Sequence, residues 1–499
     1  MYAKARICET CGAMTRLLDA HRYLFRSNLV RGVAASILIS AVGLRSAGAA
    51  ESESDRLAKL EAAVKALQDQ NSALKREVSE LKGNTHHGSP PNAKTTVDSK
   101  SVVTTTETEK KPVYVTPAGS ETKLVLGGFV QGQFETGDVA AYDGRLPGPL
   151  TTKTKDRFRL RRARINVTGE FAEQFDFKLE GDFEINDGGL TVRDANGNTL
   201  ASNTNRVGFA ATDVFINWHA LPEANIKIGQ YKAPFGLEQL TPDTKLFTIE
   251  RSQVTEALTP ERQIGVQVWG KPLAGLFPEQ KDLFTYSAGI FNGSGRNTTT
   301  NDNNEYMYVV RAESQLYAGK VAGLDTSLKV GTDYFYSRDD KGTNISQTGN
   351  LKEGLDGSLS GFVLPSADER QAYGIDGSLH VGPFDLIGEY LDERVRTRTV
   401  AGVGPAFSPF NPHGYYVTGS YFVIPKKLQL VAKWESFDPA QVVHDNLHSI
   451  TGGVNYYIHG DDIKIMADYI HTWSDFRSNN PQLGDDQFDE LFMRLQVMF

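Results

Sequence analysis

The last thirteen residues of the 499-residue chain, 487–499, have the sequence QFDELFMRLQVMF. Side chains of a β-strand point alternately to opposite faces, so from residue 491 on one face of this segment is wholly apolar, whereas the opposite face also carries polar residues. The apolar face holds Leu491, Met493, Leu495, Val497 and Phe499, and the opposite face holds Glu490, Arg494 and Gln496. A strand with an apolar outer face and a polar inner face is typical of a membrane barrel.

Composition alone also fits a large soluble all-β protein, with 39% hydrophobic and 23% charged residues. No run approaches the roughly 18 uncharged apolar residues of a spanning helix. A barrel has similar averages because only alternate residues face lipid, and the 47 Gly, 26 Phe and 19 Tyr suit tight turns and interfacial aromatic belts. The terminal aromatic strand resembles the assembly signal of outer-membrane barrels, which implies a Gram-negative cell outer membrane.

Residues 1–50 are predicted to be a signal peptide. Three arginines precede the apolar run 32–44, and small residues follow it. Met14 is an alternative start. Cys8 and Cys11 are the only cysteines of the sequence and precede the predicted cleavage site, so we expect no disulfide in the mature protein and assign these residues no metal or redox role.

Residues 51–82 carry heptads, which predict an α-helical coiled coil. The a positions are Leu57, Val64, Asn71 and Val78, and the d positions are Leu60, Leu67, Leu74 and Leu81. A single helix packed on a globular core would need a wider apolar stripe. Val at a with Leu at d favours two strands. Residues 83–120 are rich in Thr, Ser, Pro and Lys without periodicity, and we expect a disordered linker.

Residues 121–499 alternate between strand and turn patterns. The sixteen predicted strands are 122–135, 157–170, 174–186, 206–220, 223–232, 262–271, 283–292, 305–318, 323–338, 370–381, 383–396, 413–424, 426–437, 446–459, 461–475 and 487–499. Short joints alternate with long polar ones, including 187–205, 293–304, 339–369 and 397–412, as turns alternate with loops in outer-membrane barrels. The fold class we predict is an all-β transmembrane barrel of about 16 antiparallel strands, with an aqueous lumen and an N-terminal α-helical coiled coil.

The long joint 233–261 differs from the others because it carries eight large apolar side chains. Such a loop is expected to fold into the barrel rather than extend into water. The segments 228–238 (IGQYKAPFGLE), 249–252 (IERS) and 260–265 (PERQIG) resemble the phosphate-selective porin O and P family. Further matches to the family pattern are Arg161-Arg162-Ala163-Arg164, Gly169, Asp213 and Asn217.

The resemblance covers roughly residues 121–499 and implies a sixteen-stranded porin whose third long loop narrows the pore. It also implies a homotrimer, whereas the heptads favour two strands. Phosphate selectivity is a weaker implication, because it depends on basic residues that line the lumen. Passage of a desolvated oxyanion requires closely spaced cationic donors.

The candidate site residues lie on the second strand and on or beside the loop 233–261. The pore-lining and anion-binding candidates are Arg159, Arg161, Arg162, Arg164, Lys232, Lys245, Arg251 and Arg262, and the acidic loop residues are Glu238, Glu250 and Glu256. Alternation lets either Arg159 and Arg161 or Arg162 and Arg164 face the lumen, unless a bulge resets the register. An outward-facing Ile165 favours the second pair. Alternatively, some arginines lie at the rim and bind lipopolysaccharide phosphates or loop carboxylates.

The leading hypothesis is a passive diffusion channel for small hydrophilic solutes, with anion or phosphate selectivity as its finer form. Residues 121–499 hold 36 Lys and Arg against 49 Asp and Glu, a net charge of −13, but local rings of charge dominate selectivity. We predict no enzyme, cofactor or metal, because no histidine accompanies a nucleophile motif such as G-x-S-x-G. The rival hypothesis is an outer-membrane adhesin, scaffold or tether acting through the coiled coil.

The expected partners follow from the predicted location. They are outer-membrane lipid and lipopolysaccharide, sister protomers in a homotrimer, and peptidoglycan through residues 51–82, which we place in the periplasm. No nucleic-acid partner is expected.

Overall fold

The structure is a computed structural model that describes most of the chain after residue 122. The described residues are 123–148, 154–183, 185–186, 190–193, 199–203, 206–301, 303–346, 350–398 and 407–499. The predicted signal peptide (1–50), coiled coil (51–82) and linker (83–120) lie outside the described residues. Among the described residues, no helix has the length and apolar character needed to cross a membrane.

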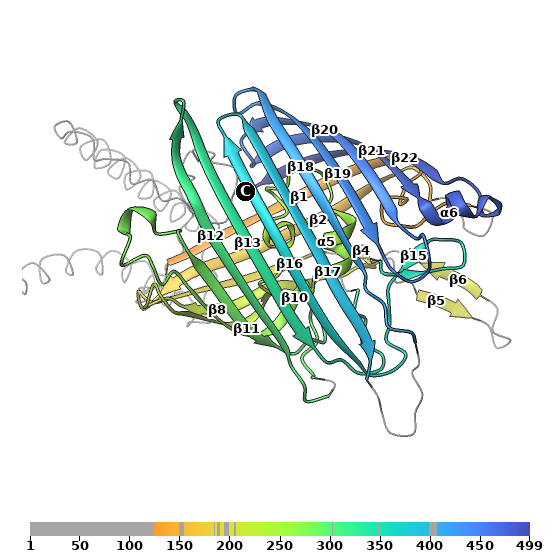
Figure 1. Cartoon of the computed structure of the whole chain (residues 1–499), viewed down its shortest axis with the longest axis horizontal. Helices are drawn as coiled ribbons and strands as arrows, with labels where there is room; N and C mark the ends of the chain where they lie inside the picture. Colours follow the sequence, from red (N-terminus) through yellow and green to blue (C-terminus); the bar gives the residue numbers. More distant parts are fainter. Residues whose placement is uncertain are drawn as a thin grey trace, which may run out of the picture. The chain divides into compact units, whose positions relative to one another are not determined.

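Sixteen antiparallel strands form a closed barrel, in which each strand pairs with its neighbours along the chain and the last pairs with the first (Figure 1). They are β1 (Lys123–Gly137), β2 (Arg157–Phe171), β3 (Phe175–Asp182), β8 (Ala210–Trp218), β9 (Asn225–Lys232), β10 (Arg262–Gly270), β11 (Thr285–Phe291), β12 (Met307–Val321), β13 (Leu324–Ser337), β16 (Asp368–Val381), β17 (Phe384–Thr397), β18 (His413–Ile424), β19 (Leu428–Asp438), β20 (Leu447–His459), β21 (Ile463–Ser474) and β22 (Gln487–Met498). Each of the sixteen predicted strands corresponds to one of these, so the predicted barrel is confirmed.

The predicted strand ends are wrong between β3 and β8. We predicted strands over 174–186 and 206–220, but the barrel strands there end at Asp182 and begin at Ala210. The described residues between them form two short antiparallel strand pairs outside the barrel sheet. The first pair is β4 (Ile185–Asn186) with β7 (Arg206–Val207), and the second, which lies between these two strands in the chain, is β5 (Leu190–Arg193) with β6 (Thr199–Asn203).

The two faces of β22 confirm the predicted alternation. Leu491, Met493 and Leu495 are 37–48% exposed on the outer face, whereas Glu490 and Arg494 are 2% exposed on the lumen side. Apolar side chains that would be costly to expose to water therefore face the region that lipid occupies around a membrane barrel. The polar side chains face inward, where they meet other side chains.

The loop 233–261 folds into the lumen, as its apolar residues predict, and contains α4 (Leu237–Leu240) and α5 (Gln253–Leu258) (Figure 1). Phe235, Val254 and Leu258 from this loop pack with inward-facing wall residues in one buried cluster. Other short elements lie in the remaining loops: η2 (Pro278–Gln280), β14 (Lys352–Glu353), β15 (Leu359–Ser360), α6 (Asp475–Asn479) and η3 (Pro481–Leu483).

The joint 339–369, predicted as a long polar loop, packs apolar side chains in the interior. Ile345, Leu351, Leu359 and Leu364 are at most 5% exposed, and they belong to the same buried cluster as the loop 233–261. The sequence did not predict their burial, because these four apolar residues are separated by polar residues and recur with neither helical nor strand spacing.

Candidate functional site

A β-bulge in β2 turns a whole row of arginines toward the lumen. Opposite Gln131 and Gly132 of β1 lie Arg162 and Leu160, so Arg161 is the extra residue of β2. An extra residue reverses the alternation, and side chains that would face opposite sides now face the same side. The bulge therefore resolves the two alternatives left open by the sequence, and the preference for Arg162 and Arg164 alone was incomplete.

All five arginines of this row point inward: Arg157, Arg159, Arg161, Arg162 and Arg164. The outer face of β2 carries Phe158 before the bulge and Ile165 after it, at 85% and 42% exposure.

Two carboxylates of the loop 233–261 meet the inner part of this row. Glu250 accepts two hydrogen bonds from Arg161, at 2.9 Å from Nε and 3.1 Å from Nη2. Asp243 lies 3.4 Å from Nη2 of Arg162 and also binds Nη1 of Arg164. The arginine row therefore does not line an open channel along its whole length, because the loop covers Arg162 and Arg164.

The outer end of the row is more accessible. Arg157 and Arg159 share one carboxylate, Glu135 of β1, at 2.7 and 3.2 Å. The side chains of Arg157, Arg159 and Arg161 are 27%, 32% and 26% exposed, whereas those of Arg162 and Arg164 are at most 8% exposed. The accessible donors of the row are thus the three at its outer end.

Two further arginines join the row through the same carboxylates. Arg251 of the loop binds Asp243, and Arg494 of β22 binds Glu250 at 2.7 Å. We call the resulting group the arginine cluster. It comprises seven arginines, Arg157, Arg159, Arg161, Arg162, Arg164, Arg251 and Arg494, paired with five carboxylates, Glu135, Glu180, Asp182, Asp243 and Glu250. Within this set the arginines outnumber the carboxylates by two, and Lys178 of β3 also pairs with Glu180, at 2.9 Å.

The loop carboxylates of the cluster stay ionised. Burial would raise the pKa of Asp243, but Arg162, Arg251 and Arg164 outweigh it and hold that pKa well below its usual range. Burial acts in the same way on Glu250, where Arg161, Arg494 and Arg162 hold the pKa well below its usual range. Each carboxylate therefore remains a permanent counter-charge to the arginines.

Two of the other predicted basic residues, Arg262 and Lys232, bind partners outside the arginine cluster. Arg262 of β10 binds Asp213 at 2.8 Å, and Lys178 of β3 binds the same Asp213 at 2.9 Å. Lys232 donates to the backbone oxygens of Gln239 and Thr241, so it supports the loop. These residues position the loop and the wall next to it.

Of the remaining predicted residues, Glu238 accepts the N–H of Ser252 and so joins the two loop helices. Lys245 lines a small pocket between the loop and the inner wall. The other lining residues include Leu237, Phe247, Ile387, Tyr416 and Thr418. This pocket combines the Lys245 ammonium, the Glu238 carboxylate and several hydroxyl groups with apolar side chains.

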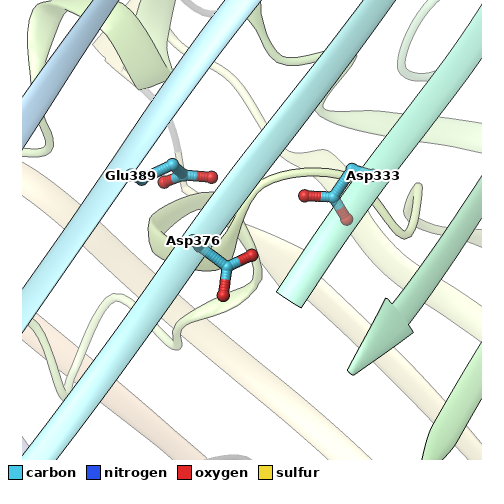
Figure 2. Close-up of side chains that lie close together, drawn as sticks. All are labelled: Asp333, Asp376 and Glu389. Atoms are coloured by element: carbon cyan, nitrogen blue, oxygen red, sulfur yellow. The ribbon is translucent and has the colours of Figure 1, made fainter. Parts of the chain in front are cut away.

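The beginning of the loop is held by carboxylates of the wall, shown in Figure 2. Glu389 of β17 accepts the N–H groups of Leu237 at 2.7 Å and Glu238 at 3.2 Å, and Asp333 of β13 accepts the N–H of Gly236 at 3.2 Å. These backbone groups would otherwise be buried without partners, which is costly. The wall carboxylates therefore anchor the first turn of α4.

Asp333, Asp376 and Glu389 also bring carboxylate oxygens within 4.8 Å of one another, a donor set that suits a hard cation. Arg311 already lies among them, 2.7 Å from Asp333 and 2.6 Å from Asp376. The three carboxylates therefore have the Arg311 guanidinium and the N–H groups of the loop as their partners. We interpret the three carboxylates as an anchor of the loop.

Wall side chains hold the rest of the loop backbone in the same way. Asp468 accepts the N–H of Ile249 at 2.6 Å, and Asn455 donates to the oxygen of Phe247 at 2.8 Å. Sequence reasoning missed Asp243, Glu389, Asp468 and Arg494 as site residues. Only Arg494 had a signal, its inward position on the last strand.

We expect Glu389→Leu to loosen the beginning of the loop. The substitution leaves the N–H groups of Leu237 and Glu238 without an acceptor, at a cost of about 1–3 kcal/mol per buried group. Hydrogen exchange measured by mass spectrometry should accelerate at residues 236–241. Glu389→Gln, which keeps one acceptor oxygen, should have a smaller effect, and Glu305→Leu on the surface should have none. Native exchange in Glu389→Leu would contradict the anchoring role.

Comparison with known proteins identifies the family of the chain. The family model described as "Phosphate-selective porin O and P" matches residues 134–499. Porin O of Pseudomonas aeruginosa is 24% identical over 440 residues, which cover 77% of this chain and 90% of that protein.

Two similar solved structures are an anion-selective porin from Comamonas acidovorans and the outer-membrane channel DcaP of Acinetobacter baumannii. The first is 12% identical and covers 76% of this chain and 100% of its own, with a TM-score of 0.46. The second is 13% identical and covers 76% and 97%, with a TM-score of 0.43. The family model matches well over half of the sequence, and the chain therefore belongs to the phosphate-selective porin O and P family of outer-membrane porins.

Proposed function

We propose that this porin is a passive diffusion channel for small hydrophilic solutes that prefers anions. The observation that supports this preference is the arginine cluster, whose seven arginines exceed its five carboxylates. An anion that leaves bulk water needs charged donors at close spacing, so that each donor releases it to the next. Membership of the porin family assigns a channel rather than an enzyme.

Solutes would meet the accessible arginines first. Arg157, Arg159 and Arg161 are each about a quarter to a third exposed, whereas the deeper arginines are sealed by the loop. The outer three would therefore contact the solute, and the deeper ones would contribute to the local potential. This local excess outweighs the net charge of residues 121–499, because a permeating ion responds mainly to the nearest charges. Phosphate, named in the family description, is the oxyanion we propose as a solute.

Two substitutions should move the ion preference in opposite directions. Arg159→Gln removes an accessible cation and should weaken the anion preference. Glu250→Gln removes the carboxylate shared by Arg161 and Arg494 and should strengthen it. The measurement is the reversal potential of single channels in planar bilayers under a KCl gradient.

Arg396→Gln is the control, because Arg396 is an exposed residue of β17 outside the cluster. A cation-selective native channel would refute the anion preference, and identical reversal potentials in all variants would refute its assignment to the arginine cluster. Phosphate added to the same bilayers should reduce the chloride current. An unchanged current would refute phosphate binding and leave the anion preference standing.

The anion preference should fall as the pH rises through about 7. Burial raises the pKa of Glu256, in α5, to about 7. Glu256 is therefore neutral below this pH and adds one negative charge to the loop above it. Because its pKa is higher in the folded protein than in the unfolded chain, this group stabilises the fold less as the pH rises from about 4.5 to about 7.

The reversal potential should accordingly change between about pH 6 and pH 8. Glu256→Gln should abolish this change and keep the low-pH value throughout. A native reversal potential that is constant over this range would show that Glu256 does not act on the permeating ion.

A second role rests on the heptads of residues 51–82. We propose that this segment extends into the periplasm of a homotrimeric porin and contacts peptidoglycan; about thirty helical residues reach roughly 45 Å. Co-sedimentation with peptidoglycan should be stronger for the full chain than for a variant lacking 51–82. Equal co-sedimentation would refute the contact, and a monomeric mass in detergent would refute the trimer.

A further inference from the structure

Three loops at the long-loop end of the barrel meet at one arginine. Arg477 lies in α6, between β21 and β22, and its side chain is 0% exposed. Its guanidinium donates to four backbone oxygens, those of Leu146 at 3.0 Å, Pro147 at 2.6 Å, Asp356 at 2.8 Å and Asp485 at 3.2 Å. These acceptors belong to the β1–β2 loop, the β13–β16 loop and the loop of Arg477 itself.

Other contacts join the first two loops directly. The N–H of Leu359 donates to the oxygen of Gly144 at 2.7 Å, and the hydroxyl of Ser358 bonds both the N–H and the oxygen of Leu146, at 3.2 and 3.3 Å. Gly144 has a φ of +76°, and a Cβ there would lie 2.8 Å from the side chain of Leu359. The approach of the two loops therefore requires a glycine at this position.

The loops are packed rather than solvated. Leu146, Leu351, Leu359 and Leu364 are at most 5% exposed and belong to one cluster with the inward-facing Phe488 of β22. The guanidinium carbon of Arg477 lies 5.6 Å from the centre of the Phe488 ring. Because these loop residues pack against the inner wall, the loops turn inward across the lumen. We call residues 138–148, 350–364 and 475–486 the outer cap.

The outer cap rests on the loop 233–261, which we call the constriction loop. The hydroxyl of Tyr142 donates to the backbone oxygen of Arg251 at 2.6 Å, and Gln253 donates to the backbone oxygen of Tyr142 at 2.8 Å. Lys433 of the wall donates to the Tyr142 hydroxyl at 2.7 Å. Tyr142 is 3% exposed. The cap and the constriction loop are thus consecutive layers of the same lumen.

We propose that Arg477 holds the outer cap in place and that the cap is a second barrier, which limits the size of solutes that reach the constriction loop. This inference rests on the proposed channel function. Arg477 is a positioning residue, since its donors are occupied by loop backbone and it acts through these loops. Only arginine offers a rigid fork with five N–H donors; the single ammonium of lysine cannot reach acceptors on three loops in the same geometry.

The test compares Arg477→Ala and Arg477→Lys with the native full chain. Both variants should raise the single-channel conductance and admit larger sugars into proteoliposomes, with the larger change in Arg477→Ala. The reversal potential under a KCl gradient should stay native, because the arginine cluster is intact. Arg145→Ala is the matched control, since the Arg145 side chain belongs to the same cap but is 46% exposed and pairs with Asp143 of its own loop. If Arg477→Ala fails to assemble, Arg477→Lys alone is compared with the native protein.

Hydrogen exchange of the detergent-solubilised chain separates the two parts of the proposal. In Arg477→Ala, exchange should accelerate at residues 138–148 and 350–364. Accelerated exchange with native conductance and size limit would show that the cap is no barrier, and unchanged exchange would show that Arg477 does not hold it. Either result overturns the proposal while leaving the channel function standing. A native protein that conducts no ions would instead contradict the proposed function, and the barrier with it.

Discussion

Backbone pairing in a medium without water is the constraint on which the whole architecture depends. A strand in hydrocarbon has no solvent to bind its N–H and C=O groups, so the sheet must close on itself. Here β1 pairs with β22, and the last residue of the chain exchanges two hydrogen bonds of 3.0 Å with Gly128. Once the sheet is closed, alternation divides the side chains into an apolar outer set and an inner set that can carry charge.

The same requirement governs the loop inside the barrel. Its backbone is buried, and the barrel wall supplies its polar partners. One part of the wall offers carboxylates and another part offers arginines. The first turn of α4 meets carboxylates such as Glu389, whereas the middle of the loop presents Asp243 and Glu250 to arginines of β2 and β22. Buried ion pairs contribute little net stability, but they specify one arrangement, because a displaced partner leaves a buried charge unpaired. The loop is thereby fixed in position inside the barrel.

The barrel could be predicted from the sequence because alternating apolar side chains recur in its strands. The predictions were incomplete where the chain departs from this alternation. The bulge at Arg161 has no residue signature, so alternation left two arginine pairs open, and the structure turns both inward. The partners Asp243 and Arg494 are far apart in sequence, and without a fold nothing connects them. The burial of Leu351 and Leu359 was not predicted in the long polar joint 339–369, because it depends on other loops that pack against them.

The most direct test of this account is the conductance of a porin in which residues 237–258 are replaced by a short Gly-Ser linker. We propose that this loop forms the narrowest part of the lumen. We therefore predict a higher single-channel conductance and a weaker ion preference in the shortened protein, provided that it still assembles as a barrel. Native conductance in the shortened protein would contradict the claim that the loop 233–261 forms the constriction.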